Sequence, residues 1–174
     1  MTRVVGAILA GGQARRFGSD KALALYDGVT LIDRIAAALR PQVATIVMCG
    51  RSPGLADRPS GIGPLGGIAA ALFHARSIGH AGVVSVPCDT PFLPGDLVAR
   101  LGAAGKPAYV AGLPVIGYWP TELVDVIDPY LAATDDHSIR AWARHIGADR
   151  IDPGVAIANI NTPADLATLA APPG

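Results

Sequence analysis

The sequence predicts an α/β fold of three layers, with helices on both faces of a mostly parallel sheet. Three short apolar runs, at residues 4–9, 44–49 and 82–86, have the composition of strands that are buried on both faces. Segments with helical spacing separate these runs, so strands and helices alternate along the chain. Such alternation predicts right-handed crossovers between parallel strands of one sheet.

The first helix is expected at residues 30–39, where Leu31, Ile35 and Leu39 share one face and Pro41 closes the helix. An alanine-rich helix is expected at 65–78, between the second and third strands. The second half is less regular, and its expected elements are helices at 94–101, 121–132, 138–145 and 162–169, with strands at 108–111, 115–118 and 155–159.

Composition limits the class of protein. With 174 residues, 51% of them hydrophobic, the chain is long enough for one sizeable core, so we expect a single domain over 1–174. The formal net charge is zero, which argues against binding to nucleic acid or an anionic membrane through a global field. Cys49 and Cys88 form no Cys-x-x-Cys pair, and no apolar run approaches the roughly 20 residues of a membrane span. No signal-peptide pattern precedes the first strand, so we expect a soluble cytoplasmic protein.

A glycine-rich and then cationic segment follows the first strand. Residues 9–21 read Leu-Ala-Gly-Gly-Gln-Ala-Arg-Arg-Phe-Gly-Ser-Asp-Lys. Gly11 and Gly12 allow a sharp turn that brings backbone N–H groups close to one anion, and Arg15, Arg16 and Lys21 add positive charge. The spacing is neither that of a Walker phosphate loop nor that of a dinucleotide-binding motif. It predicts a different kind of site for a nucleoside triphosphate.

Asp89 follows the third strand within Pro-Cys-Asp-Thr-Pro. A carboxylate at the end of a buried strand faces the crevice where open α/β sheets bind their ligands. Mg²⁺ prefers hard oxygen donors and takes one or two carboxylates together with substrate phosphates, so Asp89 is the candidate magnesium ligand. The alternative is that Asp89 caps a helix or stabilises a turn.

Two further segments carry candidate binding groups. Gly63 and Gly67 open the helix at 65–78, where they would let the backbone approach a base or ribose, or simply begin a helix. Asp57, in the loop 52–63, is a candidate acceptor for a base donor, although an exposed loop carboxylate is the alternative. Asn159 and Asn161 lie on one side of an extended segment, where they would bind a second polar substrate or complete the metal shell. The alternative is that they cap the last helix and satisfy the backbone of the turn.

These motifs together resemble the molybdenum cofactor guanylyltransferases, and the resemblance runs in order from residue 4 to about 169. The first motif alone is shared by the wider nucleotidyltransferase superfamily. The Gly11-Gly12 pair and the Asn-Ile-Asn-Thr-Pro segment favour guanylyl transfer. The sequence departs from the family in three places: residues 48–50 lack an asparagine, the loop 52–63 is short, and Leu113-Pro114 stands where the family has His-Pro.

The resemblance implies a Rossmann-like nucleotidyltransferase fold, with a nucleotide-binding half at 1–105 and an acceptor-binding half at 106–171. It implies that Asp57 lies near the guanine, that Asp89 binds magnesium and contacts the nucleotide, and that Asn159 and Asn161 lie at the pterin. The other positions that it assigns to GTP are Leu9, Ala10, Gly11, Gly12 and Lys21, to which the helix-opening Gly63 and Gly67 are added.

The expected reaction transfers GMP from GTP to the phosphate of molybdopterin and releases pyrophosphate, with Arg16, Lys21 and Asp89 as the catalytic residues. One alternative is a nucleotidyltransferase for another acceptor, by molybdopterin cytidylyl or sugar-phosphate transfer. A second is a non-catalytic GTP-binding protein of cofactor assembly. Molybdoenzymes or cofactor-assembly proteins are the expected protein partners.

Overall fold

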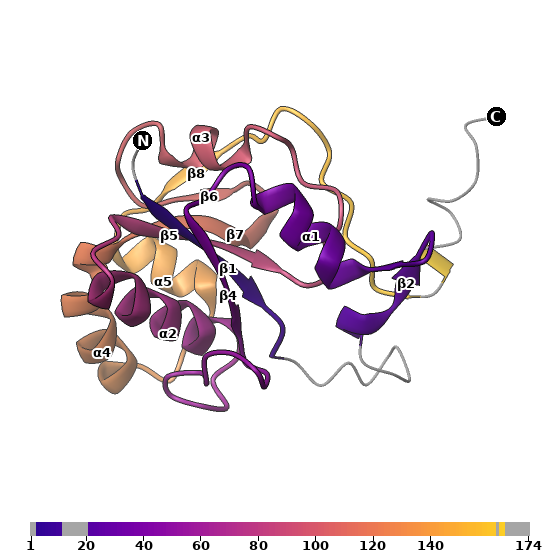
Figure 1. The fold of residues 1–174 in the computed structure, drawn as a ribbon. Helices are drawn as coiled ribbons and strands as arrows, with labels where there is room; N and C mark the ends of the chain where they lie inside the picture. Colours follow the sequence, from indigo (N-terminus) through magenta and orange to yellow (C-terminus); the bar gives the residue numbers. More distant parts are fainter. Residues whose placement is uncertain (1–2, 12–20, 163, 166–174) are drawn as a thin grey trace.

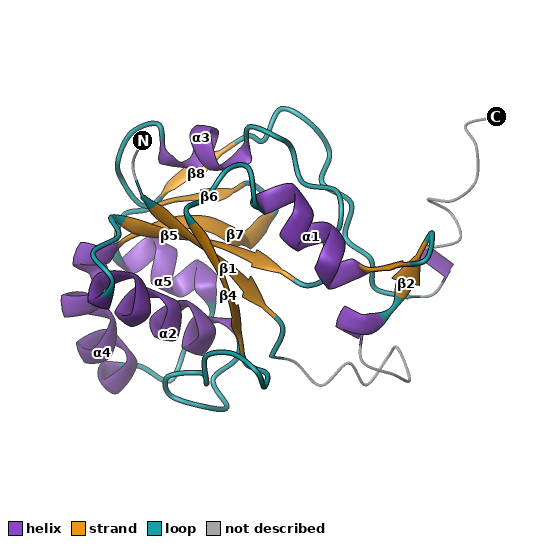
Figure 2. Cartoon of the chain, viewed as in Figure 1, coloured by secondary structure: helices purple, strands orange, loops and turns teal. Residues whose placement is uncertain are grey.

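The computed structural model describes residues 3–11, 21–162 and 164–165. Its centre is a six-stranded sheet in the order β4-β1-β5-β7-β6-β8, with helices on both faces (Figures 1 and 2). The strands in chain order are β1 (Val4–Leu9), β4 (Thr45–Cys49), β5 (Gly82–Pro87), β6 (Ala108–Val110), β7 (Leu113–Pro120) and β8 (Asp149–Ile151). The predicted three-layer α/β fold is confirmed.

The sheet has two groups of parallel strands with one antiparallel strand between them. β1 pairs in parallel with both β4 and β5, and β6 pairs in parallel with β8. Between these groups, β7 runs antiparallel to β5 on one side and to β6 on the other. The strands β4, β1, β5, β6 and β8 therefore all point the same way, and their carboxyl ends lie at the same edge of the sheet.

Two apolar clusters hold the layers together, one on each face of the sheet. Helices α2 (Pro64–Ser77), α4 (Val124–Ala133) and α5 (Ile139–His145) enclose the first cluster, in which Trp119 and Trp142 are fully buried. Helices α1 (Leu31–Leu39) and α3 (Leu97–Gly102) enclose the second, around Ile8 and Ile35. Among the described residues, no helix has the length and apolar character needed to cross a bilayer.

Local chemistry explains why these elements begin where they do. Thr30 Oγ1 accepts a hydrogen bond from the backbone N–H of Asp33 at 3.1 Å, which caps α1. Ser138 Oγ does the same for the N–H of Ala141 at 3.2 Å, at the start of α5. All six residues of β1 are buried, as the sequence predicts, whereas β4 is half-buried along most of its length because it lies at the edge of the sheet.

Several expected elements differ in the structure. The strand expected at 155–159 is wrong: these residues pair with no strand, and the last strand is β8, three residues on the sheet edge. Helix α3 begins at Leu97, not at residue 94. The helix expected at 121–132 is a 3-10 turn, η2 (Thr121–Leu123), followed by α4. Only residues 164–165 of the expected helix at 162–169 are described as helical.

A short 3-10 turn and a hairpin were not expected. The turn is η1 (Lys21–Leu23), and the hairpin joins β2 (Leu25–Tyr26) to β3 (Val29–Thr30). Between the two strands, Asp27 and Gly28 have φ values of 49° and 73°, as a two-residue hairpin turn requires. The Asp-Gly pair between apolar residues is the sequence signal that would have predicted it.

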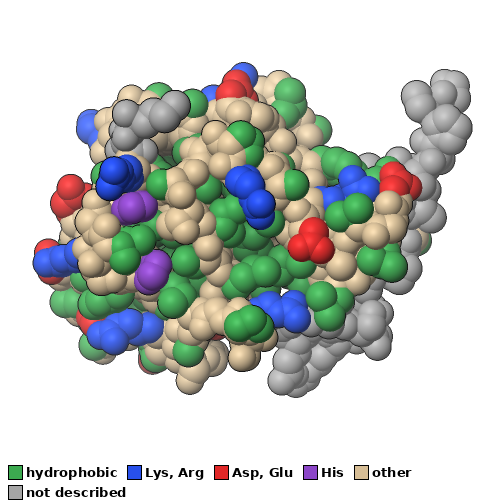
Figure 3. All heavy atoms as spheres, viewed as in Figure 1, with side chains coloured by type: hydrophobic (Ala, Val, Ile, Leu, Met, Phe, Trp, Pro, Cys, Tyr) green, Lys and Arg blue, Asp and Glu red, His purple; other side chains and the backbone are tan. Residues whose placement is uncertain are grey.

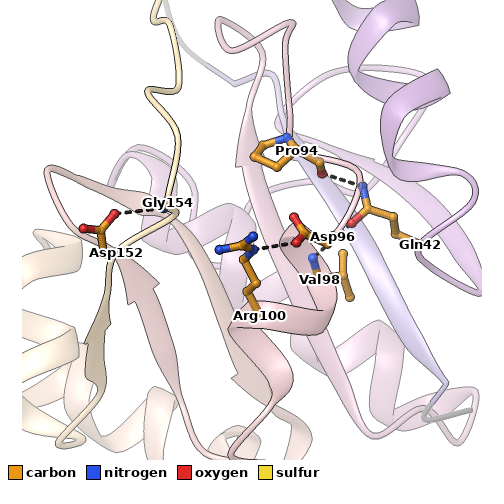
Figure 4. A network of polar contacts seen from close by, with 7 residues as sticks. All are labelled: Gln42, Pro94, Asp96, Val98, Arg100, Asp152 and Gly154. Atoms are coloured by element: carbon orange, nitrogen blue, oxygen red, sulfur yellow. Dashed lines mark hydrogen bonds and ion pairs between the residues drawn. The ribbon is translucent and has the colours of Figure 1, made fainter.

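Residues 152–161, here called the strap, run from β8 past α3 (Figure 4). Asp152 accepts a hydrogen bond from the N–H of Gly154 at 2.8 Å. Arg100 donates to Asp96 at 2.7 Å, and its Nη1 lies 2.7 Å from the place a Cβ would take on Gly154. On the other side of α3, Gln42 donates to the carbonyl of Pro94 and accepts from the N–H of Val98. The strap thus lies against a helix that is itself fixed to the sheet.

Candidate functional site

The ends of three parallel strands form one continuous edge. Leu9 is in register with Cys49 on one side and with Pro87 on the other. The pairing continues past the strands, because the N–H of Ala10 donates to the Cys49 carbonyl at 2.9 Å and the N–H of Cys88 donates to the Leu9 carbonyl at 3.2 Å. The loops that follow β1, β4 and β5 therefore begin side by side, as expected for an open α/β sheet.

Gly11 and Gly50 bring two of these loops into backbone contact. A Cβ on Gly50 would lie 2.4 Å from the Gly11 Cα, and a Cβ on Gly11 would lie 2.8 Å from the Gly50 Cα. Gly50 also has a φ of 79°, which glycine adopts without strain. Sequence reasoning assigned a role to Gly11 but missed Gly50, which stands where the resemblance led us to look for an asparagine.

Asp57 lies against this glycine contact. Its loop folds back on the end of β4, since the N–H of Gly50 donates to the Leu55 carbonyl at 2.9 Å and the N–H of Leu55 donates to the Met48 carbonyl at 2.8 Å. A Cβ on Gly11 or on Gly50 would be 3.1 Å from a carboxylate oxygen of Asp57. Burial raises the pKa of this carboxyl above its usual value. The structure brings the predicted Asp57 to the glycine loop.

The Asp57 carboxylate also affects its neighbour Cys49. Burial, and then the negative charge of Asp57, raise the pKa of the Cys49 thiol to about 12. Cys49 is therefore a protonated, buried thiol at neutral pH and has no role as a nucleophile.

Arg58 joins the loop around Asp57 to two helices. The Arg58 side chain pairs with Asp128 at 2.9 Å and lies over the ring of Phe73 at 4.1 Å. Its backbone N–H donates to the Gly66 carbonyl at 2.9 Å. These contacts tie the loop to α2 and α4, and behind Asp57 a groove of about 800 Å³ opens between them.

Helix α2 begins beside this loop with no side-chain cap. Gly63 precedes it with a φ of 78°, and Pro64 is its first residue. A Cβ on Gly67 would lie 3.0 Å from the Leu9 side chain, and one on Gly66 would lie 2.6 Å from the Pro59 carbonyl. Both glycines thus let α2 pack closely on protein, while a contact of Gly63 or Gly67 with a nucleotide stays a prediction.

Asp89 lies in the turn after β5, at the same edge. Its carboxylate is half-buried, with Oδ1 shielded from solvent, and the Oγ1 of the buried Thr90 donates to the Pro87 carbonyl at 3.3 Å. Asp89 does not cap a helix, because α3 begins only at Leu97. The alternative in which Asp89 caps a helix is therefore wrong. The position of Asp89 in a turn is compatible with ligand binding.

The strap brings the two asparagines to Asp89. The N–H of Ile160 donates to the Asp89 carbonyl at 2.8 Å, and the Ile160 side chain is fully buried. Asn159 and Asn161, on either side of it, are exposed. At the end of this segment, Asp165 accepts from the N–H groups of Asn161 and Thr162, and its own N–H donates to Thr162.

Part of the predicted site lies outside the described residues. This holds for Gly12, Arg15 and Arg16, and of Lys21 only the backbone, at the start of η1, is described. Leu9 is buried, Ala10 half-buried and Gly11 exposed at the edge. Among the described residues, no group of three or more His, Cys, Asp or Glu side chains is placed to hold a metal ion.

The described surface shows no concentration of charge on the face seen in Figure 3, where Lys and Arg side chains are dispersed among hydrophobic and polar ones.

The edge of the sheet combines close backbone turns with the two carboxylates Asp57 and Asp89 and two amides. This combination suits a ligand with both a phosphate chain and polar ring edges.

Comparison with known proteins gives a consistent result. Residues 6–151 match the family described as the MobA-like NTP transferase domain. A molybdenum cofactor guanylyltransferase of Rhodobacter capsulatus is 40% identical over 184 residues, covering 95% of this chain and 94% of that protein. One from Sinorhizobium fredii is 35% identical over 194 residues, covering 94% and 89%.

Solved structures share the fold. Molybdopterin-guanine dinucleotide biosynthesis protein A from Archaeoglobus fulgidus aligns with a TM-score of 0.75 at 21% identity, covering 94% of this chain and 95% of that one. A 2-C-methyl-D-erythritol 4-phosphate cytidylyltransferase from Thermus thermophilus aligns with a TM-score of 0.64 at 17% identity, covering 93% and 95%. With the sequence match over most of its length, this chain belongs to the family of MobA-like NTP transferases.

Proposed function

We propose that this protein transfers GMP from GTP to the terminal phosphate of molybdopterin and releases pyrophosphate. The observation that carries the proposal is the arrangement at one sheet edge of Gly11, Asp57 and Asp89, with Asn159 and Asn161 brought there by Ile160. The names of the relatives, guanylyltransferases with 35–40% identity over nearly the whole chain, support guanine and molybdopterin as the substrates. We infer that the enzyme works in the cytoplasm, where GTP is available.

The chemistry requires positioning more than proton transfer. The acceptor phosphate is already an anion, so it attacks the α-phosphorus of GTP in line without a general base, and pyrophosphate leaves. The rate enhancement then comes from alignment of the two phosphates and from neutralisation of their charge. We assign the neutralisation to Arg16 and Lys21 of the loop after β1.

Magnesium fits the donor chemistry at Asp89. The side chain offers hard carboxylate oxygens beside the loop that is expected to hold the triphosphate, and Mg²⁺ takes its other ligands from phosphates and water. When bound, the ion would supply positive charge to the phosphate oxygens of the substrate. Asp89 would hold the ion, and the hydrogen bond from the Ile160 N–H fixes the Asp89 backbone on the strap.

Asp57 supports the choice of guanine. The Watson–Crick edge of guanine carries two adjacent donors, N1–H and N2–H, and a carboxylate accepts both at once. Adenine presents an acceptor at N1, so it would face the carboxylate unfavourably. The contact of Asp57 with the glycines of both loops holds its oxygens at a fixed place for this discrimination.

The decisive experiment measures pyrophosphate release from GTP, CTP and ATP with molybdopterin supplied, for the wild-type protein and for Lys21→Ala. We expect release with GTP and a large loss in the variant. Release with CTP in preference to GTP, or with a sugar phosphate in place of molybdopterin, would favour the transferase for another acceptor. GTP binding without any pyrophosphate release would favour the non-catalytic assembly protein.

A further inference from the structure

A second polar hollow, of about 500 Å³, lies between α5 and the β6–β8 edge of the sheet. Three arginines line it: Arg140 and Arg144 from α5, and Arg150 from β8. Arg140 and Arg144 are one helical turn apart and so share a face of α5. Tyr109 of β6, which is in register with Arg150, forms part of the wall.

The charge of this hollow is not balanced by its own lining. None of the described residues that line it carries a carboxylate. Arg140, Arg144 and Arg150 are exposed, and no ion pair joins them to any residue that the structure describes.

Four other described arginines pair with carboxylates. Arg34, Arg58, Arg76 and Arg100 each pair with an aspartate, at distances between 2.6 and 3.8 Å. In a chain with 14 basic and 14 acidic residues, three arginines around a concavity with no carboxylate in its described lining create a local positive potential. Such a potential attracts an anion from solution. Outside the lining, hydrogen bonds from Ser138 and the charge of Arg144 lower the pKa of Asp136.

The hollow lies on the opposite face of the sheet from the strap. Tyr109 and Ala148 pack with the apolar cluster beneath α5, whereas the strap residue Ile157 packs with the cluster on the other face of the sheet. The two turns at its rim, at Gly112 and Gly147, have φ values of 82° and 64°, and a Cβ at either would meet nothing within 4 Å. The rim is therefore open to a ligand from solvent.

We propose that this hollow, the arginine hollow, is a binding site for a small multivalent oxyanion of the phosphate class. The guanidinium group presents its N–H donors in a planar fork that matches two oxygens of a phosphoryl group, and three such groups from two elements suit a dianion or a larger charge. The ligand is either a free phosphate or pyrophosphate ion or the phosphoryl group of a larger metabolite. The Tyr109 wall provides apolar contact beside it.

Nuclear magnetic resonance can locate the binding. The ¹⁵N-labelled protein is titrated with inorganic phosphate and with inorganic pyrophosphate, without magnesium, at constant ionic strength. We expect saturable shifts in the amides of Gly112, Arg144 and Gly147, with pyrophosphate binding more tightly than phosphate. A nucleoside monophosphate in a third titration distinguishes a free ion from the phosphoryl group of a metabolite by which of them binds more tightly.

The variant Arg144→Gln/Arg150→Gln is expected to weaken the binding by about tenfold or more and to leave guanylyl transfer unchanged. Arg40→Gln is the matched control, because Arg40 is exposed at the end of α1 on the opposite face, and its affinity should equal that of the wild type. Thermal unfolding of the wild type, the double variant and Arg40→Gln checks that all three are equally folded.

Three outcomes would overturn the proposal. Shifts confined to the loops at 9–11 and 88–91 would place the anion in the candidate active site. Shifts that grow linearly without saturation would mean charge screening alone. A glutamate-rich peptide that binds the arginine hollow more tightly than pyrophosphate at equal ionic strength would make it a docking site for an acidic protein segment.

Discussion

The N–H of Ile160 donates to the backbone carbonyl of Asp89 at 2.8 Å, so the strap and the turn after β5 are joined directly. One residue of this pair is the candidate magnesium ligand, and the other is the buried residue between two exposed asparagines. The segment expected to bind the acceptor is therefore anchored on the residue expected to hold the metal. Disturbing this joint should affect the second substrate more than the first.

Ile160→Ala tests this joint. Removal of the buried side chain should lower the free energy of unfolding by about 2–4 kcal/mol and raise the KM for molybdopterin more than that for GTP. Val155→Ala, at an exposed position of the same strap, is the control and should change stability by less than about 0.5 kcal/mol. Steady-state kinetics with each substrate varied in turn gives the comparison. Equal changes in both KM values would show that the strap does not position the acceptor.

Gly50→Ala tests the contact between the loops after β1 and β4. The new Cβ would meet the Gly11 backbone and would also sit at a positive φ, so we expect a loss of about 3 kcal/mol in stability and weaker GTP binding. Gly61→Ala is matched to it, because Gly61 has a φ of 83° but open space around its Cα, and should cost only about 1 kcal/mol. Chemical denaturation and GTP titration measure both effects. If the two variants behave alike, backbone strain alone explains the need for glycine at position 50.

Asp57→Asn should change how stability depends on pH. Because burial raises the pKa of Asp57 above its usual 3.8, the folded protein holds this proton more tightly than the unfolded chain. The wild type therefore loses stability as the pH rises from about 3.8 through the folded-state pKa, and a neutral asparagine avoids this loss.

The stability of Asp57→Asn relative to the wild type should therefore increase between about pH 3.5 and about pH 7. Urea denaturation of both proteins at several pH values measures the difference in their free energies of unfolding. The other carboxylates titrate in both proteins, so their contribution cancels in this difference. A difference that stays constant, or that decreases with pH, would contradict the effect of burial on Asp57.

Asp89→Asn should lower kcat by about a hundredfold or more, since it removes a preorganised charge at the reacting phosphates. The magnesium concentration needed for half-maximal rate should rise as well. Asp125→Asn is the control: Asp125 pairs with Arg76 on the surface at 2.6 Å, and its loss should cost at most about 1 kcal/mol and leave the rate unchanged. Near-normal turnover of the Asp89 variant at saturating magnesium would remove Asp89 from the metal site.

Sequence reasoning succeeded where hydrophobic periodicity was strong. The run Val4–Leu9 and the spacing of Leu31, Ile35 and Leu39 each match one kind of element, and both were placed within one residue. It failed where pairing depends on distant residues: β8 reads Asp-Arg-Ile, too short and polar to be recognised without β6 beside it, while the apolar stretch at 155–159 has no strand to pair with.

The candidate site shows the same division. Asp89 could be proposed from the sequence because it comes two residues after a buried strand, whereas the close approach of Gly50 to Gly11 depends on two different strands. A pattern within one short stretch of sequence does not predict how closely Gly11 and Gly50 approach each other. The side chain of Lys21 and the positions of Arg15 and Arg16 lie outside the described residues, so their roles stay predictions.

The antiparallel direction of β7 has a consequence for how the substrate specificity of such an enzyme can change by mutation. Because β7 separates β4-β1-β5 from β6-β8, the strands that lead into the candidate nucleotide loops share no hydrogen-bond ladder with β8, which leads into the strap. We expect mutations that alter acceptor choice to accumulate in the strap and to affect GTP affinity less than acceptor affinity. Acceptor specificity can then change while the strands beneath the nucleotide loops stay the same.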